Sequence, residues 1–178
     1  MIPMRRHALL FCAAAALAGA AGFAQGNDPV SALRGHDSNA PIDVDADRIE
    51  VQDRADRAVF AGNVRVRQAS LSLDTERLTV AYSSGGGIQI RRLDAAGGVV
   101  VRSPSETARG NFGIYDLDKK LITLVGDVQL RRAGSQVMGS RLVIDLQSGR
   151  AVIDGGAPGV GQSGGRATGR FTVPQRDR

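Results

Sequence analysis

Alternation of apolar and polar residues is the feature that most restricts how this chain can fold. Between positions 57 and 67, Phe60, Val64 and Val66 fall on one face of an extended chain, and arginines point the other way. The same alternation returns in residues 121–131. A period of two is typical of a strand with one buried face. Because no window of comparable strength favours a helix, we predict an all-β fold.

An internal repeat refines this prediction. Displaced by 64 positions, Gly62-Asn63-Val64 aligns with Gly126-Asp127-Val128. A shorter unit of about 30 residues also recurs: a polar residue, then Arg or Asn, then an apolar residue, with a glycine 13 or 14 residues later in three units and 20 residues later in the second. Units of two strands and two turns cannot bury their apolar faces alone. The repeat therefore predicts a stacked or rolled β array.

Each unit contains a one-residue change of phase. Leu71 and Leu73 share a face with Thr75, but Leu78 and Val80 are displaced by one position from that series. A β-bulge within one strand produces such a slip, bends the strand and tightens its twist. A short turn between two separate strands would explain it as well, and the pattern leaves both open.

The two ends of the chain differ from its middle. Residues 1–24 resemble a cleavable signal peptide, with Arg5 and Arg6 before an apolar run and the small residues Gly22 and Ala24 before the expected cut. The apolar run is shorter than the ~20 residues needed to span a bilayer. We expect a flexible linker in 25–40, the β domain in 41–155 and a flexible Gly/Arg-rich tail in 156–178.

The net charge of +5 belongs to these ends. The predicted signal contains two arginines, and the tail after position 154 contains four against one aspartate, which leaves 25–154 neutral. The β domain is therefore not basic, and we expect no nucleic acid as a partner.

Little in the sequence indicates catalysis. The one cysteine, Cys12, lies in the predicted signal, and His36 is the one histidine beyond it. A Ser-His-Asp arrangement would thus depend on a histidine in a linker. Asp116 and Asp118 alternate as paired carboxylates do, but they precede two lysines and are better explained by a polar turn. We expect no enzyme, no metal and no cofactor.

The apolar face itself has two possible uses. It could form a closed core, as in a secreted structural β array, or it could line a partly open sheet that accommodates acyl chains. The expected lining is aliphatic, with Phe60 and Phe112 as its larger members. Such a lining suits alkyl chains, because each buried CH2 contributes ~0.8 kcal/mol.

Several segments resemble one known family. Pro41–Asp47 and Ala58–Val64 are similar to the start, and Ala108–Tyr115, Leu121–Leu130 and Gly139–Leu142 to the second half, of the LptA/OstA-like periplasmic lipopolysaccharide-transport proteins. The resemblance implies a twisted, partly open β-jellyroll that stacks end to end with similar domains. It also implies a periplasmic location and a non-catalytic role in carrying lipopolysaccharide from the inner to the outer membrane.

The resemblance also implies site residues and partners. It places lipid acyl chains (lipid A) in a groove lined by Ile49, Val51, Phe60, Val64, Val66, Leu71, Leu73, Leu78, Val80, Ile122, Leu124, Val128, Leu130, Leu142 and Ile144. Edge strands would dock LptC on the inner-membrane side and LptD on the outer-membrane side, or a second copy head to tail. The residues expected there are Asp43, Val44, Asp45, Ile49 and Val51 at one end and Leu142, Ile144, Leu146 and Val152 at the other.

Two features depart from the family pattern: the Ser83–Gly87 insertion and the basic tail, which could touch lipid phosphates. Because LptC and LptD contain the same fold, an LptC-like role is also consistent with these motifs.

Overall fold

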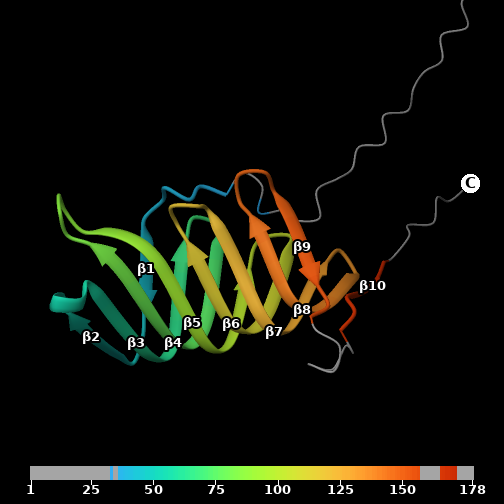
Figure 1. The fold of residues 1–178 in the computed structure, drawn as a ribbon, viewed down its shortest axis with the longest axis horizontal. Coiled ribbons are helices and arrows are strands. Elements are labelled where there is room, and N and C mark those ends of the chain that lie inside the picture. Colours follow the sequence, from blue (N-terminus) through green and yellow to red (C-terminus); the bar gives the residue numbers. More distant parts are fainter. Residues whose placement is uncertain (1–32, 34–35, 157–164, 172–178) are drawn as a thin grey trace, which may run out of the picture.

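The structure is a computed structural model that describes Leu33 and residues 36–156 and 165–171. Its described part is almost entirely antiparallel β (Figure 1). The elements are β1 (Ile42–Asp45), β2 (Arg48–Gln52), the 3-10 turn η1 (Asp53–Ala55), β3 (Arg57–Gln68), β4 (Leu71–Ser83), β5 (Gln89–Arg102), β6 (Glu106–Asp116), β7 (Leu121–Arg132), β8 (Ser135–Asp145), β9 (Arg150–Asp154) and β10 (Thr168–Arg170). The all-β prediction is confirmed, and the two most strongly alternating windows became β3 and β7.

All ten strands belong to one sheet that does not close on itself. The order is β1-β3-β4-β5-β6-β7-β8-β10. Strand β2 also pairs with β3, along a different part of it from β1, and β9 pairs with β8, along a different part of it from β10. Each end of the sheet therefore has an outer strand divided into two short pieces. Chain neighbours from β3 to β8 pair with one another, as the predicted two-strand repeat requires.

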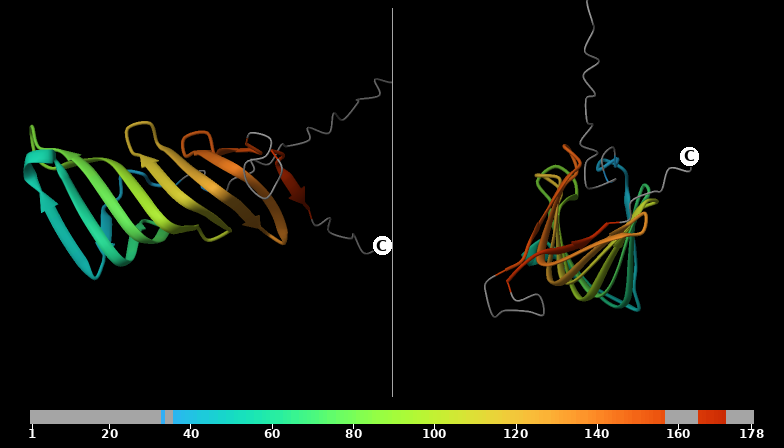
Figure 2. Two further views of the ribbon diagram at one scale, coloured as in Figure 1. Left: turned by 60° about the horizontal axis from the view of Figure 1, so that its bottom comes forward. Right: turned by 90° about the vertical axis from the view of Figure 1, so that its right-hand side faces the viewer.

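The sheet folds into a V-shaped trough. Seen along its length, the long strands run down one wall, bend and rise in the other (Figure 2). One wall carries β2 and β9 at its ends, and we call it the β2–β9 wall. The other carries β1 and β10, and we call it the β1–β10 wall. The partly open β-jellyroll that we predicted is thus present.

Bulges produce the bend. Pairing between β3 and β4 shifts register between Ala61 and Val64, and β7 and β8 do so between Val125 and Val128. The glycine at each shift has nearly the same backbone, with φ 81° at Gly62 and 82° at Gly126. Glycine adopts this left-handed region readily. The central strands therefore contain the predicted bulge, and the alternative of a turn applies to the outer strand, which breaks between β1 and β2.

Two segments differ from the expected domain boundaries. Leu33 and residues 36–40, placed by the sequence in a flexible linker, pack on the β domain, and Leu33 is buried. Thr168–Arg170, placed in the flexible tail, pairs with Gln136–Met138 of β8. Tertiary contacts order these short segments although their composition favours flexibility. The predicted signal peptide lies outside the described residues, and within the described ranges no helix has the length and apolarity to cross a membrane.

Candidate functional site

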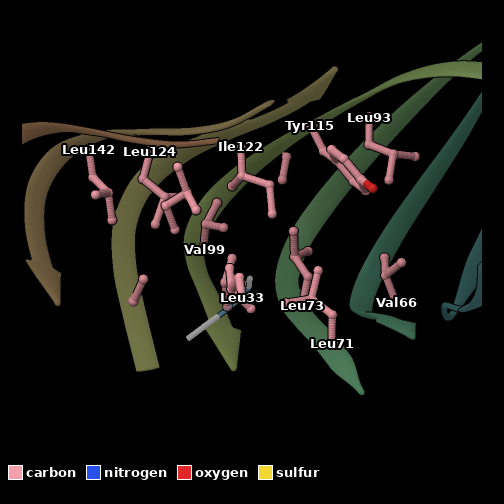
Figure 3. Packing of buried hydrophobic residues seen from close by; sticks show 14 of the residues in the cluster. Leu33, Val66, Leu71, Leu73, Leu93, Val99, Tyr115, Ile122, Leu124 and Leu142 are labelled. Carbon is pink, nitrogen blue, oxygen red and sulfur yellow. The ribbon is translucent and has the colours of Figure 1, made fainter. Parts of the chain in front are cut away.

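Rows of apolar side chains in register line the inside of the trough. On the β2–β9 wall one row consists of Phe60, Leu78, Ala95, Gly113, Leu124, Leu142 and Ile153. On the opposite wall a row consists of Val44, Val66, Leu73, Val101, Ala108, Leu130 and Val137. Adjacent strands lie ~4.8 Å apart, so each row runs roughly 30 Å along the trough. The two rows face one shared interior (Figure 3).

Most of the predicted groove residues meet in this interior. Those that are buried are Val64, Val66, Leu71, Leu73, Leu78, Val80, Ile122, Leu124, Val128, Leu130, Leu142 and Ile144. Phe60 is half-buried against them. Ile49 and Val51 lie on β2 at the end of the sheet and are 55% and 61% exposed. These two are therefore at the end of the apolar surface rather than within it.

Sequence reasoning missed other residues of the interior. They are Leu33, Leu93, Ala95, Val99, Val101, Ala108 and Tyr115, and Leu146, which the sequence placed at a docking edge, is buried with them. Four of them, Leu93, Ala95, Val99 and Val101, occupy alternate positions of β5 with Gly97 in the same series, so the alternation was present in the sequence.

Phe112 does not line the interior, contrary to our expectation. Its side chain is 57% exposed on the outside of the trough, opposite Val125 of the neighbouring strand. The cause is the register shift between β6 and its neighbours β5 and β7 at this point. Gly110 and Gly113 are both buried, so the phase slips between them and Phe112 turns outward.

The ends of the sheet also correct part of the predicted docking surface. The edge containing Asp43, Val44, Asp45, Ile49 and Val51 is formed by β1 and β2, which pair only with β3 among the described strands. Strand β8, by contrast, is covered by β9 and β10.

At this second end the predicted residues lie in three places. Leu142 and Ile144 are interior residues of β8, and Leu146 is buried just after that strand. Val152 lies on β9, which with β10 forms the outer strand at this end.

The outer faces of both walls carry charged pairs. Arg67 pairs with Asp45 at 3.2 Å, Arg65 with Asp74 at 3.3 Å, and Arg102 also contacts Asp74. Asp116 accepts a hydrogen bond from the backbone N–H of Lys119 at 3.0 Å, which lowers the pKa of Asp116. The polar turn predicted around Asp116 and Asp118 is therefore present, and Asp118 pairs with Arg91 at 2.5 Å. Among the described residues, no three His, Cys, Asp or Glu side chains cluster as a metal site would require.

A hydrogen bond joins the two walls near the open side of the trough. Gln68 lies at the end of β3 on the β1–β10 wall, and Tyr115 projects from β6 on the β2–β9 wall. The Tyr115 hydroxyl donates to Gln68 Oε1 at 3.1 Å, and both side chains are buried. Beneath this bond is a cavity of about 20 Å³, room for little more than one water-sized group. At this point of the trough the interior is therefore filled by the protein's own side chains.

Tyr115 makes stability sensitive to high pH. Burial raises the pKa of Tyr115 to about 12, whereas the unfolded chain ionises it near its ordinary value of 10. The stabilisation is complete below pH 10 and is lost as pH rises toward 12, because the unfolded state then releases a proton that the folded state retains. We expect a loss on the order of 1 kcal/mol between pH 9 and pH 11.5. Urea unfolding at both pH values measures it, and the Tyr115→Phe variant should lose less over the same interval. An equal loss in the variant would contradict this assignment.

The fold and the site together define a class. The molecule is an unclosed antiparallel β-jellyroll whose continuous inner face is aliphatic and whose outer face is charged. The comparisons with known proteins then identify the family. Residues 43–150 match the model of the LptA/(LptD N-terminal domain) LPS transport proteins, and the chain belongs to this family. It is a family of transport proteins and not of enzymes.

The chain is also similar to two other proteins. An uncharacterized protein of Rhizobium meliloti (strain 1021) is 31% identical over 124 residues, which is 66% of this chain and 67% of that protein. The crystal structure of LptH, the LptA-homologous periplasmic component of the lipopolysaccharide transport device of Pseudomonas aeruginosa, superposes with a TM-score of 0.67. That match covers 78% of this chain and 99% of LptH at 20% identity, so it establishes the shared fold.

Proposed function

We propose that this protein is a periplasmic component of lipopolysaccharide transport that holds the acyl chains of its cargo between the two walls of the trough. The observation that carries the proposal is the continuous aliphatic inner face of an unclosed sheet. Contacts between aliphatic side chains and alkyl chains are non-directional, so such a surface suits alkyl chains that slide along it. Each methylene buried there contributes ~0.8 kcal/mol.

The two ends of the sheet support a role as one link of a bridge. At one end β1 and β2, and at the other β9 and β10, leave backbone N–H and C=O groups on their outer sides without a strand partner among the described residues. Such edges favour strand addition by another domain. We propose that the β1/β2 edge faces LptC and the β9/β10 edge faces the jellyroll of LptD or a second copy. A continuous apolar surface across such joints would let the cargo pass without entering water.

Photo-crosslinking in cells tests the cargo, and two phenylalanines give a matched pair. Phe60 is half-buried on the inner face, and Phe112 is exposed on the outer face. Each is replaced by a photoreactive phenylalanine analogue of similar shape. We expect adducts with lipopolysaccharide at position 60, at least about tenfold above those at position 112. Similar yields at the two positions, or adducts from position 112 alone, would overturn the proposal.

A structural β array with a closed core is the competing function. The filled interior favours it, since an acyl chain needs more room than the 20 Å³ cavity gives. Binding of purified protein to lipid A separates the two, because a closed core binds none.

A further inference from the structure

We propose that Leu33 and residues 36–40, here called the strap, occupy the open side of the trough when it is empty and are displaced when an acyl chain enters. This inference rests on the proposed function and concerns the regulation of the same site. The strap comes from before β1 and lies at the open side of the V, near the top of the β1–β10 wall (Figure 2). It is an internal competitor for the cargo.

The strap inserts one apolar side chain into the interior. Leu33 is 4% exposed and belongs to the same buried cluster as Val99 and Leu73 (Figure 3). It is the member of that cluster contributed from before the first strand. A single leucine buries far less apolar surface than an acyl chain of many methylenes would, so the competition favours the cargo.

Gln68 holds the strap in place and links it to both walls. Its Nε2 donates to the carbonyl oxygens of Ser38 and Ala40, each at 3.0 Å. Its Oε1 contacts Nε2 of His36 at 3.1 Å and accepts the hydrogen bond from Tyr115. The strap is therefore docked through the same amide that joins the β1–β10 wall to the β2–β9 wall.

The docked strap leaves one polar group unsatisfied. Because Gln68 Oε1 is also bonded to Tyr115 and can only accept, Nε2 of His36 carries the proton. In the neutral ring Nδ1 of His36 is then an acceptor, and it is buried without a hydrogen-bond partner among the described residues. A buried unpaired acceptor disfavours the docked state relative to one in which water reaches it. Such a cost is expected of a contact between strap and trough that must break when the cargo binds.

The interior has little free space for an acyl chain. The cavity beneath the Gln68–Tyr115 bond holds about 20 Å³ and is lined by Leu71, Leu93 and Ile122. An acyl chain can therefore enter only where a side chain now lies. The strands are fixed by their ladders, whereas the strap is held by Leu33 and by side-chain bonds to Gln68. The strap is thus the part that can leave without breaking the sheet.

The test combines a mobility probe with lipid A affinity in the full chain. A nitroxide is attached at Asn39→Cys in a Cys12→Ser background, with a matched label at Ile88→Cys, an exposed turn position. We expect lipid A to convert the Asn39 spectrum from restricted to mobile and to leave the Ile88 spectrum unchanged. An Asn39 spectrum that stays restricted at saturating lipid A would overturn the inference.

Affinity gives the second readout. We expect Leu33→Ala to bind lipid A roughly five- to tenfold more tightly, because removing an internal competitor raises the population of the open state. Leu33→Met, which keeps an apolar side chain of similar volume, should bind as the wild type does. His36→Ala removes the contact between His36 and Gln68 and should therefore also weaken the docking of the strap.

The outcomes separate the two proposals. If the wild type and Leu33→Ala bind equally and the Asn39 label stays restricted, the strap is a fixed part of the fold while the proposed function stands. If neither the wild type nor any strap variant binds lipid A, the proposed function fails.

Discussion

Replacing Leu124 with alanine should destabilise the domain by about 3 kcal/mol, among the largest effects of any single truncation. Leu124 is fully buried within its row, between Gly113 and Leu142. Its truncation removes apolar contacts and leaves a cavity that the hydrogen-bonded ladders on both sides prevent from collapsing. Urea unfolding followed by circular dichroism measures the shift of the midpoint at constant slope.

The next residue is the matched control. Val125 is 41% exposed on the outer face of the same strand. We expect Val125→Ala to cost no more than about 1 kcal/mol, mainly through lower β propensity. Equal losses at the two positions would mean that the inner face is not the stabilising one, and the assignment of inside and outside would be wrong.

Gly97→Ala should cost about 3 kcal/mol, whereas Gly98→Ala should cost only about 1 kcal/mol. Both glycines have positive φ, 90° and 73°, so both variants acquire backbone strain. They differ in surroundings. A Cβ at Gly97 would lie 2.8 Å from Cβ of Glu76, while one at Gly98 meets nothing within 4 Å. Thermal and urea unfolding of the two variants measure the loss of stability in each.

Gly126 offers an independent repeat of the measurement. Its φ is 82°, and a Cβ there would lie 2.7 Å from Nδ2 of Asn111. We therefore expect Gly126→Ala to lose as much stability as Gly97→Ala. If both variants lost no more than Gly98→Ala, the polar side chains at the bend would not restrict the glycines as described.

The same comparison explains the repeat seen in the sequence. In successive units a polar side chain lies over the positive-φ glycine of the next strand: Asp47 over Gly62, Glu76 over Gly97 and Asn111 over Gly126. The polar residue and the glycine that recur about every 30 residues are thus the two halves of each bend. Their recurrence is required because every strand of a V-shaped sheet must bend at the same height.

The sequence by itself determined the all-β class, the repeat, the phase slips and most of the interior face, because strand alternation and bulge glycines are local properties of the chain. It also placed Phe60 and Leu124 inside. It misplaced Phe112, because the direction in which a bulge turns a side chain depends on how the neighbouring strands pair.

Only the tertiary structure decided the edges and the open side of the trough. Nothing local distinguishes β8, covered on its outer side, from an edge strand, or shows that β10 and the strap return to the sheet. These segments are short and weakly apolar, and their positions follow from contacts with Gln68 and with β8 that lie far away in the chain. Long-range contacts of this kind are set by the assembled sheet, so alternation along the chain cannot encode them.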